Sequence, residues 1–399
     1  MGSHNRNLHV KGITTIFAAS LLGLGLAHAE TATPAARELN PDFTPALYQQ
    51  LKTGEGNVFF SPYSITEAMA MVHAGAGGNT ATEIAKALAF GEGRAEDIAK
   101  RSEALRAQLA KLNQGENKLR VANALCVTGV PPQESFQKLV RTRYEGEVFS
   151  GDLDKINGWV KKKTEGKIEK ILDKLSEDSA CVILNAVYFK GNWMTPFDAG
   201  NTRKAAFHRK AEDPVEVDMM SREDSYPVLQ DKGVIAVELL YANGASMVLV
   251  MPGKADGMAA LEEQLSAPFV AGLCADLRKT QPKEINLSVP KFKVATKYGL
   301  IPAMKELGMV DAFAEERADF KAMYDKTPVS IAQIVHKATL EVDEKGSVAA
   351  AATAVEIQAN SITEGPPEIR FDRPFLVLIR DQATGTTLFM GRINDPTAK

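Results

Sequence analysis

The sequence predicts an α+β fold in a single domain. Helical patterns predominate up to about residue 172, and strand patterns predominate from residue 180 onward. Separate runs of helices and strands are typical of α+β architecture, whereas a doubly wound parallel sheet would alternate them. The chain has 399 residues, of which 45% are hydrophobic and 24% charged, an ordinary globular composition. Its length would allow two or three domains, but no charged or Pro/Gly-rich linker divides it after residue 40.

The N-terminal segment has the pattern of an export signal. Arg6, His9 and Lys11 precede an apolar run. That run covers residues 13–26, and Ala27-His28-Ala29 follows it with small residues at the two positions that a signal peptidase reads. The run is too short and too interrupted by glycine for a membrane span. We therefore expect a secreted or periplasmic protein, divided into a signal peptide (residues 1–29, cleaved after Ala29), a flexible lead-in (30–39) and one folded domain (40–399).

The first part of the folded domain is predicted to be mainly helical. Ser61-Pro62 begins one helix, because serine is a good N-cap and proline suits the first turn. Thr80-Ala81-Thr82-Glu83 fits a capping box and opens another. The glycine cluster between them (Gly75, Gly77 and Gly78) indicates a helix stop. The expected helices cover residues 40–51, 61–74, 80–88, 96–112, 132–144 and 155–172 (with a break near Gly166), and the expected strands cover 57–60 and 119–127.

The second part is predicted to consist mainly of strands. Residues 181–189, CVILNAVYF, are almost continuously apolar, as in a strand covered on both faces. Asn243-Gly244 is a strong turn signal and predicts a hairpin between residues 234–240 and 246–251. We expect further strands over residues 285–294, 329–342, 375–380 and 387–393, and a short helix over 298–306.

A long segment of small residues, 344–367, separates two of these strands. Its sequence is EKGSVAAAATAVEIQANSITEGPP, and it has no proline between residues 344 and 359. Loops longer than about 12–15 residues without secondary structure are uncommon and usually functional. As a strand, the segment would place alternate residues on one face: Ser347, Ala349, Ala351, Thr353, Val355 and Ile357. An alanine-rich helix is the alternative, and the local pattern leaves both open.

The sequence lacks the common motifs of enzymes and of cofactor or metal sites. It contains no GxSxG elbow, no GxxxxGK phosphate loop, no HExxH and no CxxC. After the expected signal cleavage only His73, His208 and His336 remain, and their spacing does not indicate a metal. We therefore expect no catalytic residues, no metal and no cofactor, and we do not expect an enzyme.

Charge and cysteine content limit the partners and the compartment chemistry. The net charge of -3 and a pI near 6.2 give no electrostatic reason to expect nucleic acid or an anionic membrane as partner. The basic cluster at residues 161–163 is followed closely by two glutamates, so it should be a solvated helix face. The cysteine count is odd and each cysteine has an apolar context, which predicts buried thiols without a disulfide framework: Cys126, Cys181 and Cys274.

Several motifs, taken together and in order, resemble the serpin family. The match runs from about Asn40 to Pro396. Any single motif would be weak, but their number and order are specific. The motifs are NVFFSPYSI (57–65), LNAVYFKGNW (184–193), VPKF (289–292), HKATL (336–340), VDEKG (342–346), FDRPF (371–375) and LFMGRINDP (388–396).

The resemblance implies a serpin fold with three β-sheets, A to C, eight or nine helices, and an exposed reactive-centre loop. It also implies suicide inhibition, in which a serine protease attacks the loop, forms a covalent acyl complex and is trapped when the cleaved loop inserts into sheet A, the family's known form of strand addition. We expect a monomer that binds a serine protease, and neither nucleic acid nor membrane. Two alternatives are a non-inhibitory serpin (carrier, chaperone or storage protein) and an inhibitor of an asparagine-specific cysteine protease.

The resemblance assigns a hinge at the start of the loop, and its residues can be checked for insertion. They are mostly small and include no proline, and Gly346 supplies backbone freedom. Val348 departs from the inhibitory pattern, in which an acidic residue is usual, but it should face outward, so insertion should survive. This composition disfavours the non-inhibitory alternative. The hinge comprises Glu344, Lys345, Gly346, Ser347, Val348, Ala349, Ala350, Ala351 and Ala352.

The position of the attacked bond follows from the hinge by resemblance. Counting from the hinge glycine as in typical family members places it at Asn360-Ser361. The segment before Pro366-Pro367 is longer than in many relatives, so the bond could shift between Ala359 and Thr363. Cleavage at Ala359, Ile362 or Thr363 would suit an elastase-like serine protease, the first-ranked target, whereas asparagine would suit an asparagine-specific cysteine protease.

Two further groups of residues carry over by motif. The family's shutter, where polar groups bond across the strands of sheet A that must part, corresponds to Ser61, Ser64, Asn185 and His336. The breach, where the loop first enters, corresponds to Trp193, Lys291 and Glu344. Simpler roles remain open for them: a satisfied buried histidine, a core tryptophan and an inert surface ion pair between Lys291 and Glu344.

Overall fold

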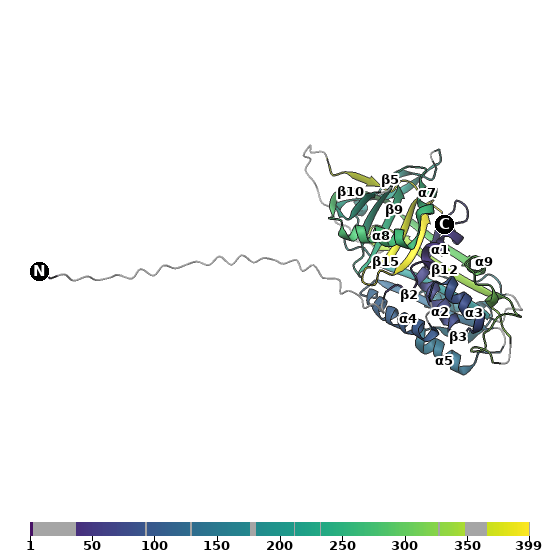
Figure 1. Ribbon diagram of the computed structural model, residues 1–399. Coiled ribbons are helices and arrows are strands. Elements are labelled where there is room, and N and C mark those ends of the chain that lie inside the picture. Colours follow the sequence, from purple (N-terminus) through teal and green to yellow (C-terminus); the bar gives the residue numbers. More distant parts are fainter. Residues whose placement is uncertain are drawn as a thin grey trace. The chain divides into compact units, whose positions relative to one another are not determined.

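The folded part of the chain is an α+β assembly of three β-sheets, as predicted. The computed structural model describes residues 1–2, 37–91, 94–127, 130–175, 181–210, 212–231, 233–325, 328–347 and 365–398. The expected signal peptide and most of the lead-in, residues 3–36, lie outside these ranges, as do residues 348–364 of the long segment. All the elements below belong to the unit Thr31–Lys399 (Figure 1).

Sheet A is the sheet into which the resemblance predicts that the loop inserts. Its strands run in the order β11-β12-β4-β2-β3, and a two-residue strand, β13, pairs with β4. Its central strand β4 is buried on both faces, as its apolar sequence predicted: Ile183 packs in a cluster with α2, and Leu184 packs in a cluster with α6. The bounds are β2 (Lys118–Val127), β3 (Glu147–Ser150), β4 (Cys181–Asn192), β11 (Phe292–Gly299), β12 (Gln333–Val342) and β13 (Gly346–Ser347).

Sheets B and C complete the β structure. In sheet B, the hairpin predicted around Asn243-Gly244 is confirmed, and Gly244 has a φ of 89°. Sheet B has the order β1 (Val58–Phe60), β16 (Thr387–Ile393), β15 (Phe375–Asp381), β9 (Ala245–Pro252), β8 (Val234–Leu240) and β7 (Val228–Asp231). Sheet C has the order β14 (Glu368–Arg370), β10 (Lys283–Pro290), β6 (Pro214–Tyr226) and β5 (Arg203–His208).

Nine α-helices fall within the described ranges. The predicted start of α2 is confirmed: Ser61 is the N-cap, its Oγ accepts from the Ser64 backbone N–H at 3.1 Å, and Pro62 follows at the first position. The helices are α1 (Phe43–Leu51), α2 (Pro62–His73), α3 (Gly78–Ala87), α4 (Ala95–Leu109), α5 (Glu134–Arg143), α6 (Leu153–Lys163), α7 (Met258–Gln264), α8 (Ala267–Lys279) and α9 (Ile301–Glu306).

The buried apolar side chains form three clusters. The first contains residues of the helices α1, α2, α3, α8 and α9, together with residues of sheet B and of one face of sheet A. The second lies among sheets A, B and C and contains stacked aromatic rings such as Phe59 and Phe389, whose centroids are 5.2 Å apart. The third lies between the other face of sheet A and α6. Sheet A is therefore covered on both faces, which makes its register strongly specified.

The capping box predicted at Thr80 is wrong. Helix α3 begins two residues earlier, with Gly77 as an N-cap that makes no side-chain cap hydrogen bond. Thr80 Oγ instead accepts from the Asp319 backbone N–H at 3.0 Å, and the Glu83 carboxylate accepts from the Asp311 backbone N–H at 2.6 Å. Both side chains are hydrogen-bonded to a segment more than 200 residues away, so no local signal could have indicated these contacts.

Three other expectations about secondary structure need correction. Residues 285–294 are not one strand, because β10 ends at Pro290 and β11 begins at Phe292 in a different sheet, while the Lys291 backbone N–H donates to Asp218 O at 2.8 Å. The break near Gly166 is confirmed, but the chain after it does not return to helix. Tyr298 belongs to β11, and α9 starts only at Ile301. No element was expected over residues 203–231 or 258–279, which form β5 to β7, α7 and α8.

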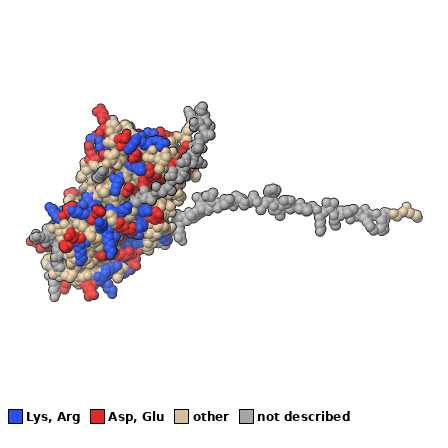
Figure 2. Space-filling view, turned by 180° about the vertical axis from the view of Figure 1, so that it is seen from behind, with Lys and Arg blue, Asp and Glu red and all other residues tan. Residues whose placement is uncertain are grey.

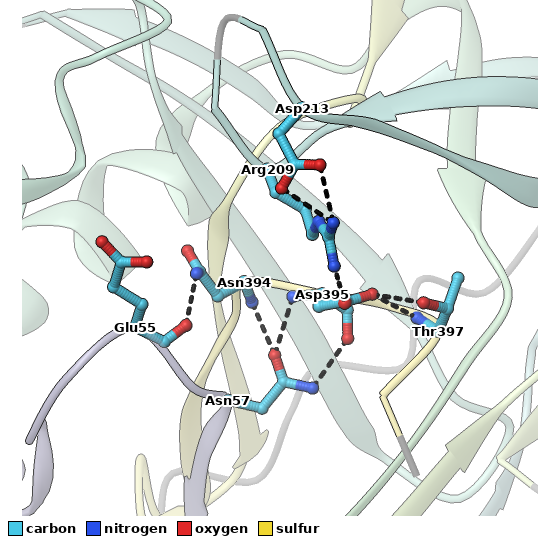
Figure 3. Close-up of polar contacts among 7 residues, drawn as sticks. All are labelled: Glu55, Asn57, Arg209, Asp213, Asn394, Asp395 and Thr397. Carbon is cyan, nitrogen blue, oxygen red and sulfur yellow. Dashed lines mark hydrogen bonds and ion pairs between the residues drawn. The ribbon is translucent and has the colours of Figure 1, made fainter.

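The C-terminal segment is fixed by a polar network, which explains the Asn-Asp-Pro ending. Asn57 Oδ1 accepts from the backbone N–H groups of Asn394 (2.7 Å) and Asp395 (2.9 Å), and its Nδ2 donates to Asp395 O at 2.8 Å (Figure 3). Arg209 pairs at 2.7 Å with both Asp213 and Asp395. The network thereby connects the end of the chain to β1 and to the turn between β5 and β6.

The surface and the cysteines agree with the composition. Lys and Arg are interspersed with Asp and Glu over the face shown in Figure 2. The three cysteines are buried and free, as predicted. Among the described residues, no helix has both the length and the apolar character that crossing a membrane requires.

Candidate functional site

The two central strands of sheet A meet directly. β4 and β12 pair in parallel, from Val182 opposite Gln333 to Tyr188 opposite Thr339. We call this junction the seam. Over this length the two strands are hydrogen-bonded to each other directly, so sheet A is closed along the seam and no strand lies between them.

The first residues of the long segment pair with sheet A at the C-terminal end of β4, which we call the top of the seam. After β12 ends at Val342, the chain turns, and β13 pairs antiparallel with β4, with Gly346 opposite Asn192 and Ser347 opposite Gly191. Gly346 has a φ of 142°, and a Cβ there would lie 2.1 Å from Gly191 O. A glycine is therefore required at this position. Ser347 is fully buried, in agreement with the face predicted for it.

The turn before β13 is held by backbone and side-chain hydrogen bonds. The Trp193 backbone N–H donates to Lys345 O at 2.8 Å, and its Nε1 donates to Asp343 O at 3.0 Å. Lys291 Nζ lies 2.9 Å from Glu344 Oε2, and Thr202 Oγ lies 2.7 Å from Glu344 Oε1. Burial opposes ionisation of the Glu344 carboxyl, but the hydrogen bonds from Lys291 and Thr202 outweigh it and lower its pKa. The three residues predicted for the breach are thus brought together.

We call the surroundings of β13 at the top of the seam the entrance. Tyr241 belongs to the entrance, and the sequence analysis missed it. Its hydroxyl is 2.9 Å from Ser347 Oγ, and its ring stacks on Trp193 with centroids 4.4 Å apart. Burial raises the pKa of Tyr241, so the hydroxyl keeps its proton. Tyr241 comes from the turn of the β8–β9 hairpin, 106 residues before Ser347, and nothing in the local sequence signals the contact.

The four residues predicted for the shutter also meet, midway along the seam. His336 and Asn185 are register partners across the seam, and His336 Nδ1 bonds to Asn185 Oδ1. His336 Nε2 accepts from the Ser61 backbone N–H at 3.1 Å, so Nδ1 carries the proton. Asn185 Nδ2 donates to Ser64 Oγ at 2.6 Å and to Ser64 O at 2.9 Å. Asn123 on β2, which the prediction omitted, accepts from the same Nδ2.

Burial keeps the imidazole of this cluster neutral. His336 is fully buried, and desolvation lowers its pKa from 6.5 to about 3. A neutral ring can accept a hydrogen bond at one nitrogen and donate one from the other, which is how His336 connects the start of α2 to β4. The cluster therefore links both sides of the seam to the helix behind it.

The remaining predicted positions lie outside the described residues. They are Val348, Ala349, Ala350, Ala351 and Ala352 of the hinge, the bond Asn360-Ser361 and the window from Ala359 to Thr363. The chain resumes at residue 365, and β14 pairs in parallel with β10 of sheet C. The segment from residue 348 to residue 367 therefore connects sheet A to sheet C. Within the described ranges, no group of three or more metal-ligating side chains could hold a metal ion.

Comparisons with known proteins agree with this arrangement. A family model described as "Serpin (serine protease inhibitor)" matches residues 38–396. The chain is 35% identical to Iripin-2 of Ixodes ricinus over 395 residues (94% of this chain, 96% of the relative). It is 33% identical to the alpha-1-antiproteinase S of Cavia porcellus over 373 residues (90% of this chain, 89% of the relative).

A solved structure gives the same result for the fold. Human thyroxine-binding globulin in complex with thyroxine superposes with a TM-score of 0.81 at 30% identity, covering 91% of this chain and 98% of the other. The predicted three-sheet serpin fold is thus confirmed. Since the family is one of protease inhibitors, the prediction of a protein that is not an enzyme is confirmed as well. The family match spans nearly the whole folded chain, and the sequence relatives cover about nine-tenths of it; the chain belongs to the serpin family.

Proposed function

We propose that the protein is an irreversible inhibitor of serine proteases that inserts its cleaved loop into the seam of sheet A. The observation that carries this proposal is the position of β13. The first residues of the loop already pair with β4 at the top of the seam, and the seam below them is closed. A strand that continued from Ser347 would run antiparallel to β4 and would separate it from β12.

The chemistry of trapping requires one covalent step. The protease serine oxygen attacks the carbonyl carbon of Asn360, or of a neighbour within the window Ala359 to Thr363. The peptide bond breaks, its nitrogen takes up the proton that the serine hydroxyl loses and leaves as the amine of the following residue, and an ester joins the loop to the protease. Insertion of the residues before the ester then moves the protease to the far end of sheet A and distorts its active site, so that the protease can no longer direct water onto the ester.

The free energy released by loop insertion is large enough to trap a protease. A new central strand forms about a dozen backbone hydrogen bonds at ~0.5–1.5 kcal/mol each, on the order of 10 kcal/mol in total. That is comparable with the stability of a whole domain, so insertion can distort a bound enzyme. The uninserted form is then the higher-energy, metastable form of the protein. The small residues of the hinge, which carry no proline, support insertion.

The other predicted sites take their roles within this proposal. Ser61, Ser64, Asn185 and His336 would hold the seam closed until the loop enters. Trp193, Lys291 and Glu344 would hold the entrance. An elastase-like serine protease ranks first as the target, and the N-terminal pattern supports export with cleavage after Ala29.

A non-inhibitory carrier is the second candidate, favoured by the likeness to thyroxine-binding globulin. One experiment separates the two. The protein is incubated with an elastase-like protease and with an asparagine-specific cysteine protease, and the products are run on a denaturing gel. An inhibitor gives a covalent complex that survives SDS, and its cleaved form melts at a higher temperature than the intact form. A carrier gives only clipped protein with an unchanged melting temperature, which would refute the proposal.

A further inference from the structure

The chain that leaves α6 forms a strap across the outer face of sheet A. We use this name for residues 166–175. Its buried side chains include Ile168, Ile171 and Leu172, and they belong to one cluster with Leu184 of β4 and Val335 of β12. The strap therefore packs on both sides of the seam.

One set of contacts joins the strap to α6. Asn157 of α6 donates from Nδ2 to Leu172 O at 3.0 Å and accepts at Oδ1 from the backbone N–H groups of Ile171 (2.9 Å) and Leu172 (3.1 Å). Helix α6 itself contacts β2, and its Ile156 and Val160 share a cluster with residues of β2 and β4. These contacts connect the strap to the strands on one side of the seam.

A second set of contacts reaches the strands on the other side. Lys337 of β12 donates from Nζ to Lys170 O at 2.7 Å. Lys297 of β11 lies 2.6 Å from Asp173 Oδ2, and Lys170 lies 2.9 Å from Asp173 Oδ1. The hydrogen bonds from Lys170 and Lys297 lower the pKa of Asp173 to about 2, so it remains charged at neutral pH.

Insertion of a strand would move the two sides of the seam, and therefore these two sets of contacts, apart. A strand that enters the seam moves β11 and β12 away from β4 by one inter-strand spacing, about 4.8 Å. The strap is hydrogen-bonded to α6 on the β2–β4 side. To keep their contacts of 2.6–2.7 Å, Lys297 and Lys337 would have to stretch their side chains across the widened seam, so insertion strains or breaks these contacts.

We propose that Asp173 and Lys297, together with Lys337, form a latch across the seam that exists only while sheet A is closed and that slows insertion of the loop. This inference rests on the proposed function, since it concerns the same insertion step. A contact present before insertion and lost during it stabilises the starting state more than the transition state, so its removal speeds the step.

The chain offers a matched control. Lys293 lies on β11 four residues before Lys297 and pairs at 3.7 Å with Glu341 of β12. Both strands of that pair lie on the same side of the seam and move together. Lys293→Met thus removes an exposed ion pair from the same strand without touching the strap. Lys297→Met and Asp173→Asn break the latch while keeping the size of each side chain.

The rate of insertion can be measured without a protease. A synthetic peptide with the sequence of residues 347–358 is added to the intact protein, and its incorporation is followed by the appearance of the more heat-stable form. We expect Lys297→Met and Asp173→Asn each to raise the rate about two- to five-fold, the range that an exposed ion pair can supply. The double variant should be no faster than Asp173→Asn, because both changes remove the same contact.

The test also has a protease arm and a salt arm. Trapping of an elastase-like protease should become faster in the same two variants. High salt should speed peptide incorporation in the wild-type protein and have less effect in Lys297→Met, because salt screens exposed charges. Equal rates for Lys293→Met and Lys297→Met, or no change in either, would overturn the latch. If the wild-type protein traps no protease but peptide incorporation still responds to Lys297→Met and not to Lys293→Met, the proposed function fails and the latch stands.

Discussion

The hydroxyl groups of Tyr241 and Ser347 lie 2.9 Å apart in the interior of the protein, although 106 residues separate them in the chain. Ser347 belongs to the long segment and is the last residue described before its gap at 348–364, and Tyr241 lies in the turn of the β8–β9 hairpin. Tyr241 also stacks on Trp193, whose indole N–H holds the carbonyl of Asp343. One tyrosine thus joins the start of the loop to the strand β4 and to the turn between them.

The substitution Tyr241→Phe should lower the free energy of unfolding of the intact protein by about 1 kcal/mol. It removes one buried hydrogen bond and leaves Ser347 Oγ without that partner, while the ring can still stack on Trp193. Urea unfolding measures the change. The matched control is Tyr144→Phe, because the Tyr144 hydroxyl is buried and has no hydrogen-bond partner among the described residues. An equal loss in both variants would contradict a stabilising role for the Tyr241–Ser347 contact.

The stability of the intact protein should depend on pH through His336. The pKa of His336 is lowered from 6.5 to about 3 in the folded state by burial. Between these values the unfolded chain binds the proton and the folded chain does not, so stability contributed by the neutral ring is present above about pH 6.5 and is lost as the pH falls. The slope due to one proton approaches about 1.4 kcal/mol per pH unit.

Comparison with His336→Gln isolates this contribution. Burial also raises the pKa values of Glu38 and Glu67 and lowers that of His73, and these groups titrate in both proteins. The difference in slope between the wild-type protein and the variant, from urea unfolding between pH 4 and 7, belongs to His336. Parallel curves would show that the ring is not kept neutral by the fold.

The substitution Ser347→Arg should convert an inhibitor into a substrate. Ser347 is already buried against β4 in the intact protein, so an arginine there should leave the sheet, and insertion would then have to return its unpaired charge to the sheet at a cost of several kcal/mol. Each ~1.4 kcal/mol slows insertion about tenfold relative to hydrolysis of the ester. The measurement is the number of inhibitor molecules consumed per protease molecule trapped.

Ala350→Arg is the control for that variant. The alternation from Ser347 predicts that residue 350 faces the opposite side, so the same side chain should be tolerated there. Ala349→Pro should behave like Ser347→Arg, because proline removes a backbone donor from the new strand. Full trapping by Ser347→Arg would argue against insertion at this seam.

The three thiols should be unreactive in the folded protein. Cys126, Cys181 and Cys274 are buried and free, and desolvation raises the pKa of Cys181 to about 12. A thiol reagent at pH 8 should therefore titrate none of them in the native protein and all three in guanidinium chloride, with or without a reductant. Fast reaction of one thiol in the native state would show that part of the core opens readily.

Much of the architecture could be predicted because its causes are local in the chain. The apolar run of β4, the Asn243-Gly244 turn and the Ser61-Pro62 helix start each depend on a few consecutive residues, and each is confirmed. The co-location of His336, Asn185 and Ser64, by contrast, was expected only from the resemblance to a family. No periodicity indicates that residues on β12, β4 and α2 share one hydrogen-bond network.

The sequence by itself determined many of the strands and helices, although not those over residues 203–231 and 258–279, because propensity, capping and alternation act over neighbouring residues. It also predicted a loop whose small side chains suit insertion. Only the tertiary structure decided that Tyr241 meets Ser347, that Thr80 bonds Asp319 in place of a capping box, and that the strap reaches Lys297 across the seam. Those contacts join groups of residues that are more than 100 positions apart in the chain. These contacts form only when packing brings whole sheets together, so the local sequence does not predict them.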